Sequence, residues 1–321
     1  MDIIKQYGEE KKNMVYMAKP VYGGWVTFTT HLALKYNYDL YKVSKRCEKN
    51  KRDYGYNVQY QNLSIDEIIK LPNLFITAID KHYYEYLEHF PEGTTIVIHD
   101  PTELKAIDNP ILKYKDKLRF VTIRETVKEF LHTKYGIVST FKVHPFYEYE
   151  KEQIPPLMTR CVSTSRIDFD KNTDMLLRAN MSLPKDKQIT LFGAENRLYV
   201  HHKLKELNID LHWKGKLKKT YPLEYDGKDI LKGAKYMIDM STIKNDGGGS
   251  QYTFLEAIYN GCVLILNEEW IKRGNVFIHG KNCLSVKSDA DIVKILMEDI
   301  DYSDLVIESQ KLLKKHINVL W

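Results

Sequence analysis

Residues 246–266 carry backbone and side-chain groups that could bind an anion beside a hydroxylated ligand. Three successive glycines let the backbone approach a ligand closely, and the first helical turn after Ser250 directs unpaired N–H groups outward with a partial positive charge. Glu256 follows within two turns, where its carboxylate can accept hydrogen bonds from a sugar hydroxyl. Gly261 ends the helix, and residues 263–266 form an apolar strand that a parallel sheet would bury on both faces. Spacing alone fits an ordinary β/α unit with a glycine turn equally well.

Residues 253–265, Thr-Phe-Leu-Glu-Ala-Ile-Tyr-Asn-Gly-Cys-Val-Leu-Ile, resemble the signature of the retaining family 4 type glycosyltransferases, which have the GT-B fold. That signature has two glutamates eight positions apart; the second contacts the nucleotide ribose and the first approaches the donor sugar. Glu256 matches the second glutamate, but Gly248 stands at the position of the first. Sugar recognition should therefore differ from the family norm. The DNA α-glucosyltransferases of T-even bacteriophages also keep only the second glutamate, and the resemblance extends to them.

The resemblance implies that the donor is held by the glycine loop and the start of its helix. The residues concerned are Gly248, Gly249, Ser250, Gln251, Tyr252, Thr253 and Glu256. It also assigns a donor contact to Gly193, which ends a strand predicted over residues 188–193. Residues 209–215 match a second place where the family positions the nucleotide.

A turn at residues 19–24 leads from a predicted strand at 14–18 into a predicted helix at 25–36, as at the start of a Rossmann unit. Gly23 and Gly24 resemble the glycine-rich first loop of GT-B enzymes, which lies near the donor phosphates. The turn lacks the full G-x-G-x-x-G pattern, so a dinucleotide cofactor is not expected. A Gly-Gly turn before a helix is also common without any ligand.

His99 and Asp100 follow a predicted strand at residues 95–98 and precede Pro101. Ligands of parallel sheets gather at the carboxyl ends of strands. The resemblance implies that His99 faces the donor sugar and the acceptor, and that Asp100 helps to orient the reacting sugar. A structural cap on a turn that ends in proline is the alternative.

Arg166 and Lys171 lie in a polar loop after a strand that begins near residue 160. Both are cations that can neutralise charge on a phosphate leaving group. They match the places at which the family's arginine and lysine hold the donor diphosphate. The alternative is a solvated ion pair with Asp168 or Asp170.

No metal site is expected from the sequence. Asp-x-Asp pairs occur at residues 168–170 and 299–301, but neither has the setting of the metal-binding motif of the other major glycosyltransferase fold, which lies in an early domain between apolar strands. The cysteines are far apart and form no Cys-x-x-Cys pair, so neither zinc nor a disulfide framework is indicated. They are Cys47, Cys161, Cys262 and Cys283.

Length and composition limit the class of protein. A chain of 321 residues suits two domains of roughly 150 residues each. With 43% hydrophobic and 28% charged residues and no long apolar run, we expect no membrane span and, without a signal peptide, a cytoplasmic location. A net charge of +5 is compatible with a local basic groove and anionic ligands. Abundant Lys, Tyr, Asn and Ile suit an AT-rich genome, such as a viral or bacterial one.

Alternation of strands and helices predicts an α/β chain, and the resemblance makes it a GT-B chain of two Rossmann-like doubly wound domains facing an interdomain cleft. Residues 1–150 would hold the acceptor and residues 151–305 the nucleotide-sugar donor. A helix at 306–321 would pack back on the first domain. The charged and Pro-Pro-containing stretch at 148–156 has the composition of a linker.

The leading hypothesis is a retaining, metal-independent glycosyltransferase, a hexosyltransferase acting on a UDP-sugar. The nucleotide sugar is a substrate, so no cofactor is expected. The acceptor hydroxyl belongs to a glycan, a hydroxylated DNA base or a lipid-linked precursor. Two alternatives stay open: an epimerase of nucleotide sugars, and a noncatalytic protein that binds nucleotide sugars.

Overall fold

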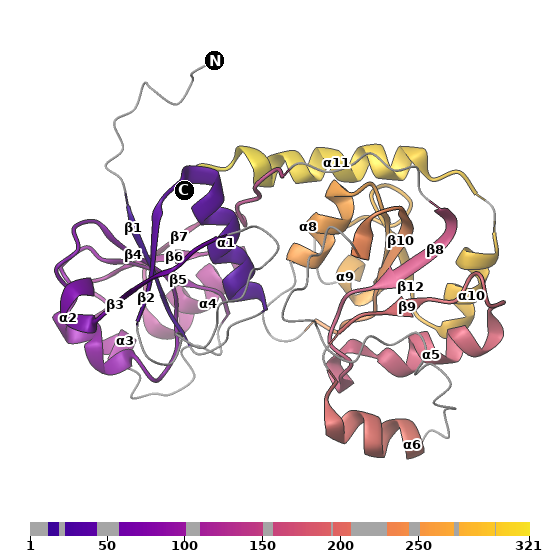
Figure 1. Cartoon of the computed structure of the whole chain (residues 1–321), viewed down its shortest axis with the longest axis horizontal. Coiled ribbons are helices and arrows are strands. Elements are labelled where there is room, and N and C mark those ends of the chain that lie inside the picture. Colours follow the sequence, from indigo (N-terminus) through magenta and orange to yellow (C-terminus); the bar gives the residue numbers. More distant parts are fainter. Residues whose placement is uncertain are drawn as a thin grey trace. The chain divides into compact units, whose positions relative to one another are not determined.

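The computed structural model describes residues 12–18, 23–43, 58–100, 110–149, 157–193, 195–206, 230–243, 251–272, 276–298 and 300–321. The chain divides into two compact units (Figure 1). Unit 1 comprises Met1–Arg52, Asn57–Tyr147 and Val319–Trp321, and unit 2 comprises Asp53–Tyr56 and Glu148–Asn318. Each unit is built on a parallel sheet with helical connections, which confirms the predicted α/β class.

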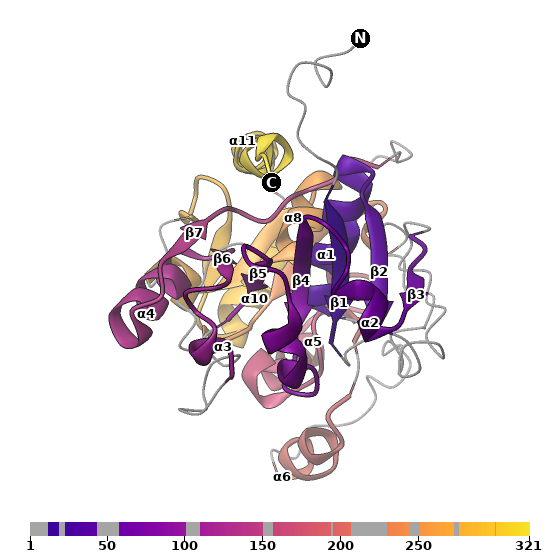
Figure 2. The ribbon, with the colours of Figure 1, turned by 90° about the vertical axis from the view of Figure 1, so that its left-hand side faces the viewer.

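The described strands of unit 1 pair in parallel in the order β3-β2-β1-β4-β5-β6-β7 (Figure 2). Their bounds are β1 Asn13–Met17, β2 Asp39–Val43, β3 Gln61–Leu63, β4 Leu74–Ile79, β5 Thr95–Ile98, β6 Arg119–Thr122 and β7 Ser139–Phe141. The chain adds β2 and β3 on one side of β1 and β4 to β7 on the other. Strand order therefore reverses between β1 and β4, and ligands of open α/β sheets bind beyond the carboxyl ends of strands at such a reversal.

The connections of unit 1 pack on both faces of its sheet. They are α1 Gly24–Tyr36, α2 Ile65–Ile68, the 3-10 helix η1 Tyr84–His89, α3 Pro110–Lys113 and α4 Glu125–Tyr135. The buried cluster on one face joins Ile96 and Phe120 of the sheet to Ile111 of α3 and Leu131 of α4. Helix α1 packs on the opposite face, because right-handed crossovers before and after a reversal lie on opposite sides of a sheet.

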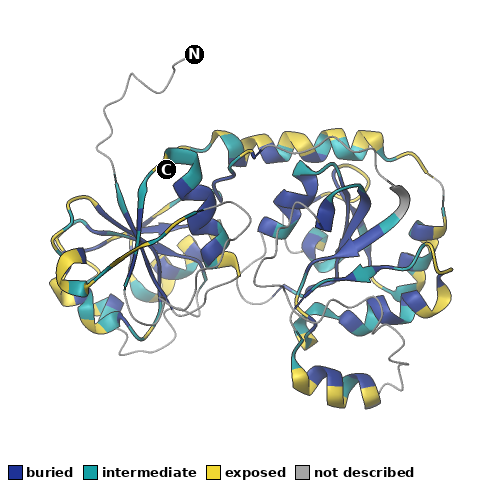
Figure 3. Ribbon diagram, in the orientation of Figure 1, coloured by how far each residue is buried: buried dark blue, intermediate teal, exposed yellow. Residues whose placement is uncertain are grey.

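Unit 2 has a second parallel sheet, in the order β12-β11-β10-β8-β9. Its strands are β8 Leu157–Ser163, β9 Thr190–Leu191, β10 Ala234–Asp239, β11 Val263–Asn267 and β12 Leu284–Val286. Its helices are η3 Phe169–Lys171, α5 Thr173–Ser182, the π-helix η4 Tyr199–Lys203, α6 Leu204–Glu206, α8 Tyr252–Tyr259, α9 Glu269–Lys272, α10 Asp289–Met297 and α11 Ser303–Asn318. Here the order reverses between β8 and β10. Figure 3 shows the central strands of each unit buried and the outer surfaces of the helices exposed.

The end of the chain is anchored in unit 1. Helix α11 belongs to unit 2 in the division above, whereas the residues that follow it belong to unit 1. The indole Nε1 of Trp321 donates to the carbonyl of Val143 at 3.0 Å, and its backbone N–H donates to the hydroxyl of Tyr36 at 2.9 Å. The ring lies edge-on to Phe28 and Phe75, at centroid distances of 5.1 and 6.3 Å. Only 3% of Trp321 is exposed.

Glycines stand where side chains would not fit, for two different reasons. Gly136 follows the last residue of α4 in the left-handed region, at φ 64°, and so ends that helix. Gly193 has no such φ, but a Cβ built there would lie 2.0 Å from the carbonyl oxygen of Ser165. The loop after β8 and the end of β9 therefore approach each other more closely than any other residue type would allow.

We expect Gly193→Ala to lower the free energy of unfolding by about 2 kcal/mol or more, because one backbone segment must move to admit the methyl group. Gly24→Ala is the matched control, since nothing lies within 4 Å of a Cβ at that position and its φ is ordinary. Its effect should stay within about 1 kcal/mol. Urea denaturation of both variants measures the difference, and equal stabilities would contradict the close approach.

Candidate functional site

In unit 1, the glycine turn and His99 lie at the same edge of the sheet. Gly23 is the N-cap of α1 at φ 100°, a conformation that favours glycine. Helix α1 has no side-chain cap and no acidic residue in its first turn, so its first N–H groups keep their partial positive charge. Trp25, in that turn, lies 5.9 Å from the His99 ring, centroid to centroid. The start of α1 and the end of β5 therefore lie beside each other within this unit.

His99 is a buried side chain with a defined orientation. Its Nε2 lies 2.7 Å from the carbonyl oxygen of Thr77 in β4, and the ring packs edge-on to Phe28 at 4.9 Å. A carbonyl oxygen only accepts hydrogen bonds, so Nε2 carries the proton, and Nδ1 is an acceptor in the neutral ring. Thr77 is held in turn by Thr29 of α1, through a 2.8 Å hydrogen bond between their hydroxyls. Asp100, beside it, is partly exposed.

Burial lowers the pKa of His99 to about 4, because desolvation disfavours the imidazolium. The hydrogen bond to Thr77 and the charge of Asp100 oppose this shift in pKa, and the charge of Arg124 adds to it. The ring is therefore neutral at pH 7. It suits the positioning of a hydroxyl better than the donation of a proton.

In unit 2, Arg166 and Lys171 both lie in the loop after β8 but have different partners. The guanidinium of Arg166 lies 2.8 Å from an Asp168 oxygen and 3.4 Å from an Asp170 oxygen. The ion-pair alternative left open by the sequence is thus the arrangement in this structure. The Arg166 side chain is 53% exposed, so a phosphate could replace one of these partners.

Lys171 reaches the end of the neighbouring strand β10. Its ammonium donates to the hydroxyl of Ser241 at 2.9 Å, and that hydroxyl donates to the buried carboxylate of Asp239. The backbone of Asp170 also accepts from the N–H of Thr242 at 2.9 Å. The loop after β8 is thereby fixed to the residues that precede the glycine loop. No local sequence pattern pointed to Ser241 or Asp239, because this pairing joins segments about 70 residues apart.

Glu195 is a further polar group that the sequence analysis did not single out. It pairs with Ile167 in an isolated parallel bridge. Its Oε1 is buried and has no hydrogen-bond partner in the part of the chain that the structure describes. A buried carboxylate oxygen without a donor is costly, so this atom is suited to accept a hydrogen bond from a ligand. Gly193, two residues earlier, has the structural role described above, next to the same loop.

Helix α8 begins at Tyr252, and Gln251 is its N-cap without a side-chain hydrogen bond. Its first turn has no acidic residue, and the buried hydroxyl of Thr253 there has no hydrogen-bond partner among the described residues. The partial positive charge of a helix N-terminus and the Thr253 hydroxyl fit an anionic ligand at this end. The predicted contacts at Gly248, Gly249 and Ser250 lie outside the described residues.

Glu256 lies one turn further along α8 and is 6% exposed. Burial raises the pKa of Tyr252 well above its ordinary value, and the negative charge of Glu256 raises that pKa further. Tyr252 is itself 6% exposed, so its ring belongs to the packing of the helix. The predicted donor role of Glu256 therefore concerns a nearly buried carboxylate, and not a surface one.

Each unit thus gathers its predicted residues at one edge of its own sheet. Unit 1 brings together Gly23, Gly24, His99 and Asp100. Unit 2 joins Arg166 and Lys171 to the end of β10, with Gly193 beside them. Within the described residues, no group of three or more His, Cys, Asp or Glu side chains could hold a metal ion. No helix in the described part of the chain is long and apolar enough to cross a membrane.

Comparisons with known proteins place this geometry in a fold class. No protein-family model matches the chain, and no curated protein matches it in sequence. Among solved structures, Anabaena Alr3699/HepE in complex with UDP has a TM-score of 0.64 over 96% of this chain and 95% of that chain, at 11% identity. The complex of the same protein with UDP-glucose gives 0.62 over 95% of both chains, at 11% identity. A glycosyltransferase from Rickettsia africae ESF-5 gives 0.61 over 96% and 95%, at 12% identity.

At these identities the likeness shows the fold. The chain has the GT-B class of fold, with two Rossmann-like α/β units, as the sequence predicted. The likeness extends over nearly the whole length of each compared chain.

The low pKa of His99 makes stability depend on pH. Its folded-state pKa is about 4 and the ordinary value is 6.5, so between these pH values the unfolded chain binds the proton and the folded chain does not. The stability that neutral His99 provides is therefore complete above pH 6.5 and is lost as the pH falls toward 4, by up to about 3 kcal/mol.

His99→Gln cannot take up this proton, so the unmodified protein should lose about 2 kcal/mol more than the variant between pH 7 and pH 5. Urea denaturation of both proteins at the two pH values measures this difference. Parallel losses would show that His99 titrates normally in the folded protein.

Proposed function

We propose that this protein is a glycosyltransferase that takes a sugar from a UDP-sugar. The observation that carries the proposal is the fold likeness over about 95% of both chains to Alr3699/HepE, described in complexes with UDP-glucose and with UDP and glucose. The likeness to the Rickettsia africae glycosyltransferase, over a similar share, supports the reaction class. A fold can host many activities, so the residues at the sheet edges supply the rest of the argument.

Unit 2 holds the nucleotide diphosphate in this proposal. The N-terminus of α8, with its unused Thr253 hydroxyl, faces one phosphate, and Lys171 and Arg166 neutralise the charge on the departing diphosphate. Arg166 exchanges Asp168 or Asp170 for phosphate oxygens when the donor binds. Glu256 accepts hydrogen bonds from the ribose hydroxyls, as the sequence resemblance implies.

The chemical step breaks the bond between the anomeric carbon and the diphosphate oxygen, and the electron pair leaves with UDP. The acceptor hydroxyl oxygen bonds to the same carbon and passes its proton to a departing phosphate oxygen. Attack on the face from which UDP leaves gives retention of configuration. Neutral His99, with Asp100, orients the reacting sugar and takes no part as a proton donor, since its low pKa leaves it uncharged.

Unit 1 holds the acceptor in this proposal, and a glycan or a hydroxylated DNA base is the acceptor class. UDP release from a panel of UDP-sugars, with and without each acceptor, tests the function. Transfer is confirmed by mass spectrometry of the product, and its anomeric configuration by NMR. Interconversion of nucleotide sugars without acceptor would instead indicate an epimerase. UDP-sugar binding without release or transfer would indicate a noncatalytic binding protein.

Transfer should continue in excess chelator, because cationic side chains and a helix N-terminus take the place of a metal at the diphosphate. The measurement compares the initial rates of UDP formation with and without EDTA. A rate that is abolished by EDTA and restored by manganese or magnesium would replace this mechanism with a metal-dependent one.

Glu256→Gln should weaken UDP binding about tenfold or more, because a charge-assisted hydrogen bond to the ribose loses its charge. Isothermal titration calorimetry with UDP measures the affinity. Glu268→Gln is the control, since that carboxylate, directly after β11, pairs with Lys272 of α9 at 2.8 Å and has no proposed ligand. Equal UDP affinity in both variants, with both folded, would remove Glu256 from the donor site.

A further inference from the structure

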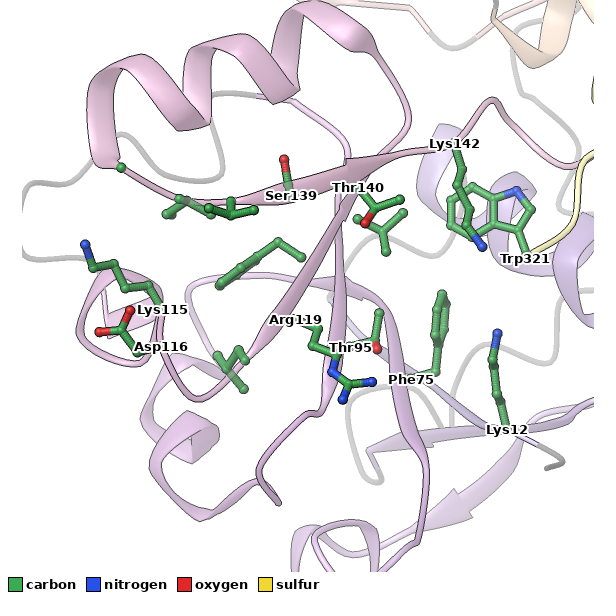
Figure 4. A pocket seen from close by; sticks show the side chains of 16 residues that line it. Lys12, Phe75, Thr95, Lys115, Asp116, Arg119, Ser139, Thr140, Lys142 and Trp321 are labelled. Atoms are coloured by element: carbon green, nitrogen blue, oxygen red, sulfur yellow. The ribbon is translucent and has the colours of Figure 1, made fainter. Parts of the chain in front are cut away.

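Unit 1 contains a hollow on one face of its sheet, lined by residues other than His99 and the glycine turn. The hollow has a volume of about 620 Å³, and Phe75, Thr95, Arg119, Val121, Thr140 and Trp321 are among the residues that line it (Figure 4). Thr95 and Arg119 are the first residues of β5 and β6, whereas His99 follows the last residue of β5. At about 3.3 Å per residue, Thr95 and His99 are separated by roughly 13 Å along β5.

The hollow exists because the helices cover this face of the sheet unevenly. Parallel pairing aligns Phe75 with Thr95 and Thr95 with Arg119, so these three side chains share one face. Ile96 and Phe120 are the next residues along β5 and β6, and they point to the opposite face, where α3 and α4 cover them. Helix α1 packs beside β1 and β4, and Trp321 covers Phe75. Arg119 and Thr140, further along the sheet, are left exposed.

The hollow is strongly basic. Four cations, Lys12, Lys115, Arg119 and Lys142, line it, and Asp116 is the one acid among its lining residues. The guanidinium of Arg119 and the ammonium of Lys115 have no ion pair or hydrogen bond within the described part of the chain. Cations gathered in a concave surface repel one another and raise the local concentration of anions. An anionic ligand would offset that repulsion.

The cations are distributed along the hollow. Figure 4 shows Lys115 at one end, Lys12 and Lys142 at the other, and Arg119 between them. The ammonium groups of Lys12 and Lys142 lie over the rings of Phe75 and Trp321, at 5.6 and 5.7 Å from the centroids. The ligand should therefore carry several negative groups and not a single one.

We propose that this hollow binds a small polyanion with several phosphate groups, at a site separate from the UDP-sugar site. Its volume is in the range of small-molecule sites, roughly 300 to 1,000 Å³. Arg119 and the lysines pair with the phosphates, and the hydroxyls of Thr95 and Thr140 donate to their oxygens. Phe75 and Trp321 are 5% and 3% exposed, so they offer no open face on which a nucleic-acid base could stack.

Inorganic tripolyphosphate is the probe, titrated calorimetrically into the full chain with saturating UDP present, so that a diphosphate site in unit 2 is already occupied. We expect one binding event that weakens as salt is raised. Arg119→Glu should reduce the affinity at least tenfold. Lys115→Glu should reduce the affinity by a similar factor. Because it changes only an exposed side chain outside the strands, it keeps the test valid if the Arg119→Glu variant misfolds.

Lys128→Glu is the matched control, because it makes the same change of charge on exposed α4, outside the hollow. Equal effects of all three substitutions, or no binding below about 1 mM, would overturn the proposal. Single-stranded oligonucleotide and phosphatidylglycerol vesicles form two further arms. If either binds through Arg119 and Lys115 and tripolyphosphate does not compete, the hollow is a surface for a polymer or a membrane instead. If UDP fails to bind, the proposed function fails, but the comparison of variants still tests the hollow.

Discussion

The reversal of strand order in each parallel sheet is the constraint on which both the candidate site and the basic hollow depend. Strands added on either side of β1 in unit 1, and of β8 in unit 2, send their connections to opposite faces. The loops at the carboxyl ends therefore separate and leave their polar groups accessible at one edge. The same rule leaves part of one face of the unit 1 sheet without a helix of its own, and Arg119 of the hollow lies on that uncovered part.

The polar groups at these edges are held by contacts with neighbouring strands. Lys171 is fixed to β10 through Ser241 and Asp239, so a cation of the first loop is positioned by the end of another strand. Arg166 stays on the surface with two carboxylates around it, which keeps the free loop close to neutral until a ligand competes for the guanidinium. Preorganised cations of this kind cost little reorganisation when charge develops on a leaving group.

His99 shows how burial selects the chemistry that a side chain can perform. The ring packs against Phe28, which in turn contacts Trp321 from the far end of the chain. Packing on this side and the Thr77 carbonyl on the other fix both its tautomer and its neutral state. A residue in this setting positions other groups by its shape and its hydrogen bonds. Because the ring stays neutral in the folded protein, it contributes to the stability of the fold near pH 7.

The sequence by itself determined the features that depend on local pattern. Alternating apolar strands and helices predicted an α/β chain, Gly261 predicted the end of α8, and residues after strands marked the sheet edges where polar groups lie. These signals are readable because strand periodicity, helix caps and glycine conformations involve residues close together in the chain.

Only the tertiary structure decided what those residues touch. It gave Gly193 a contact with Ser165, paired Arg166 with two aspartates, left an oxygen of Glu195 without a donor and buried His99. It also gathered Lys12, Lys115, Arg119 and Lys142 around one hollow. Such properties depend on close approach between segments distant in sequence, where desolvation and packing set the energies, and no local pattern records which segments will meet.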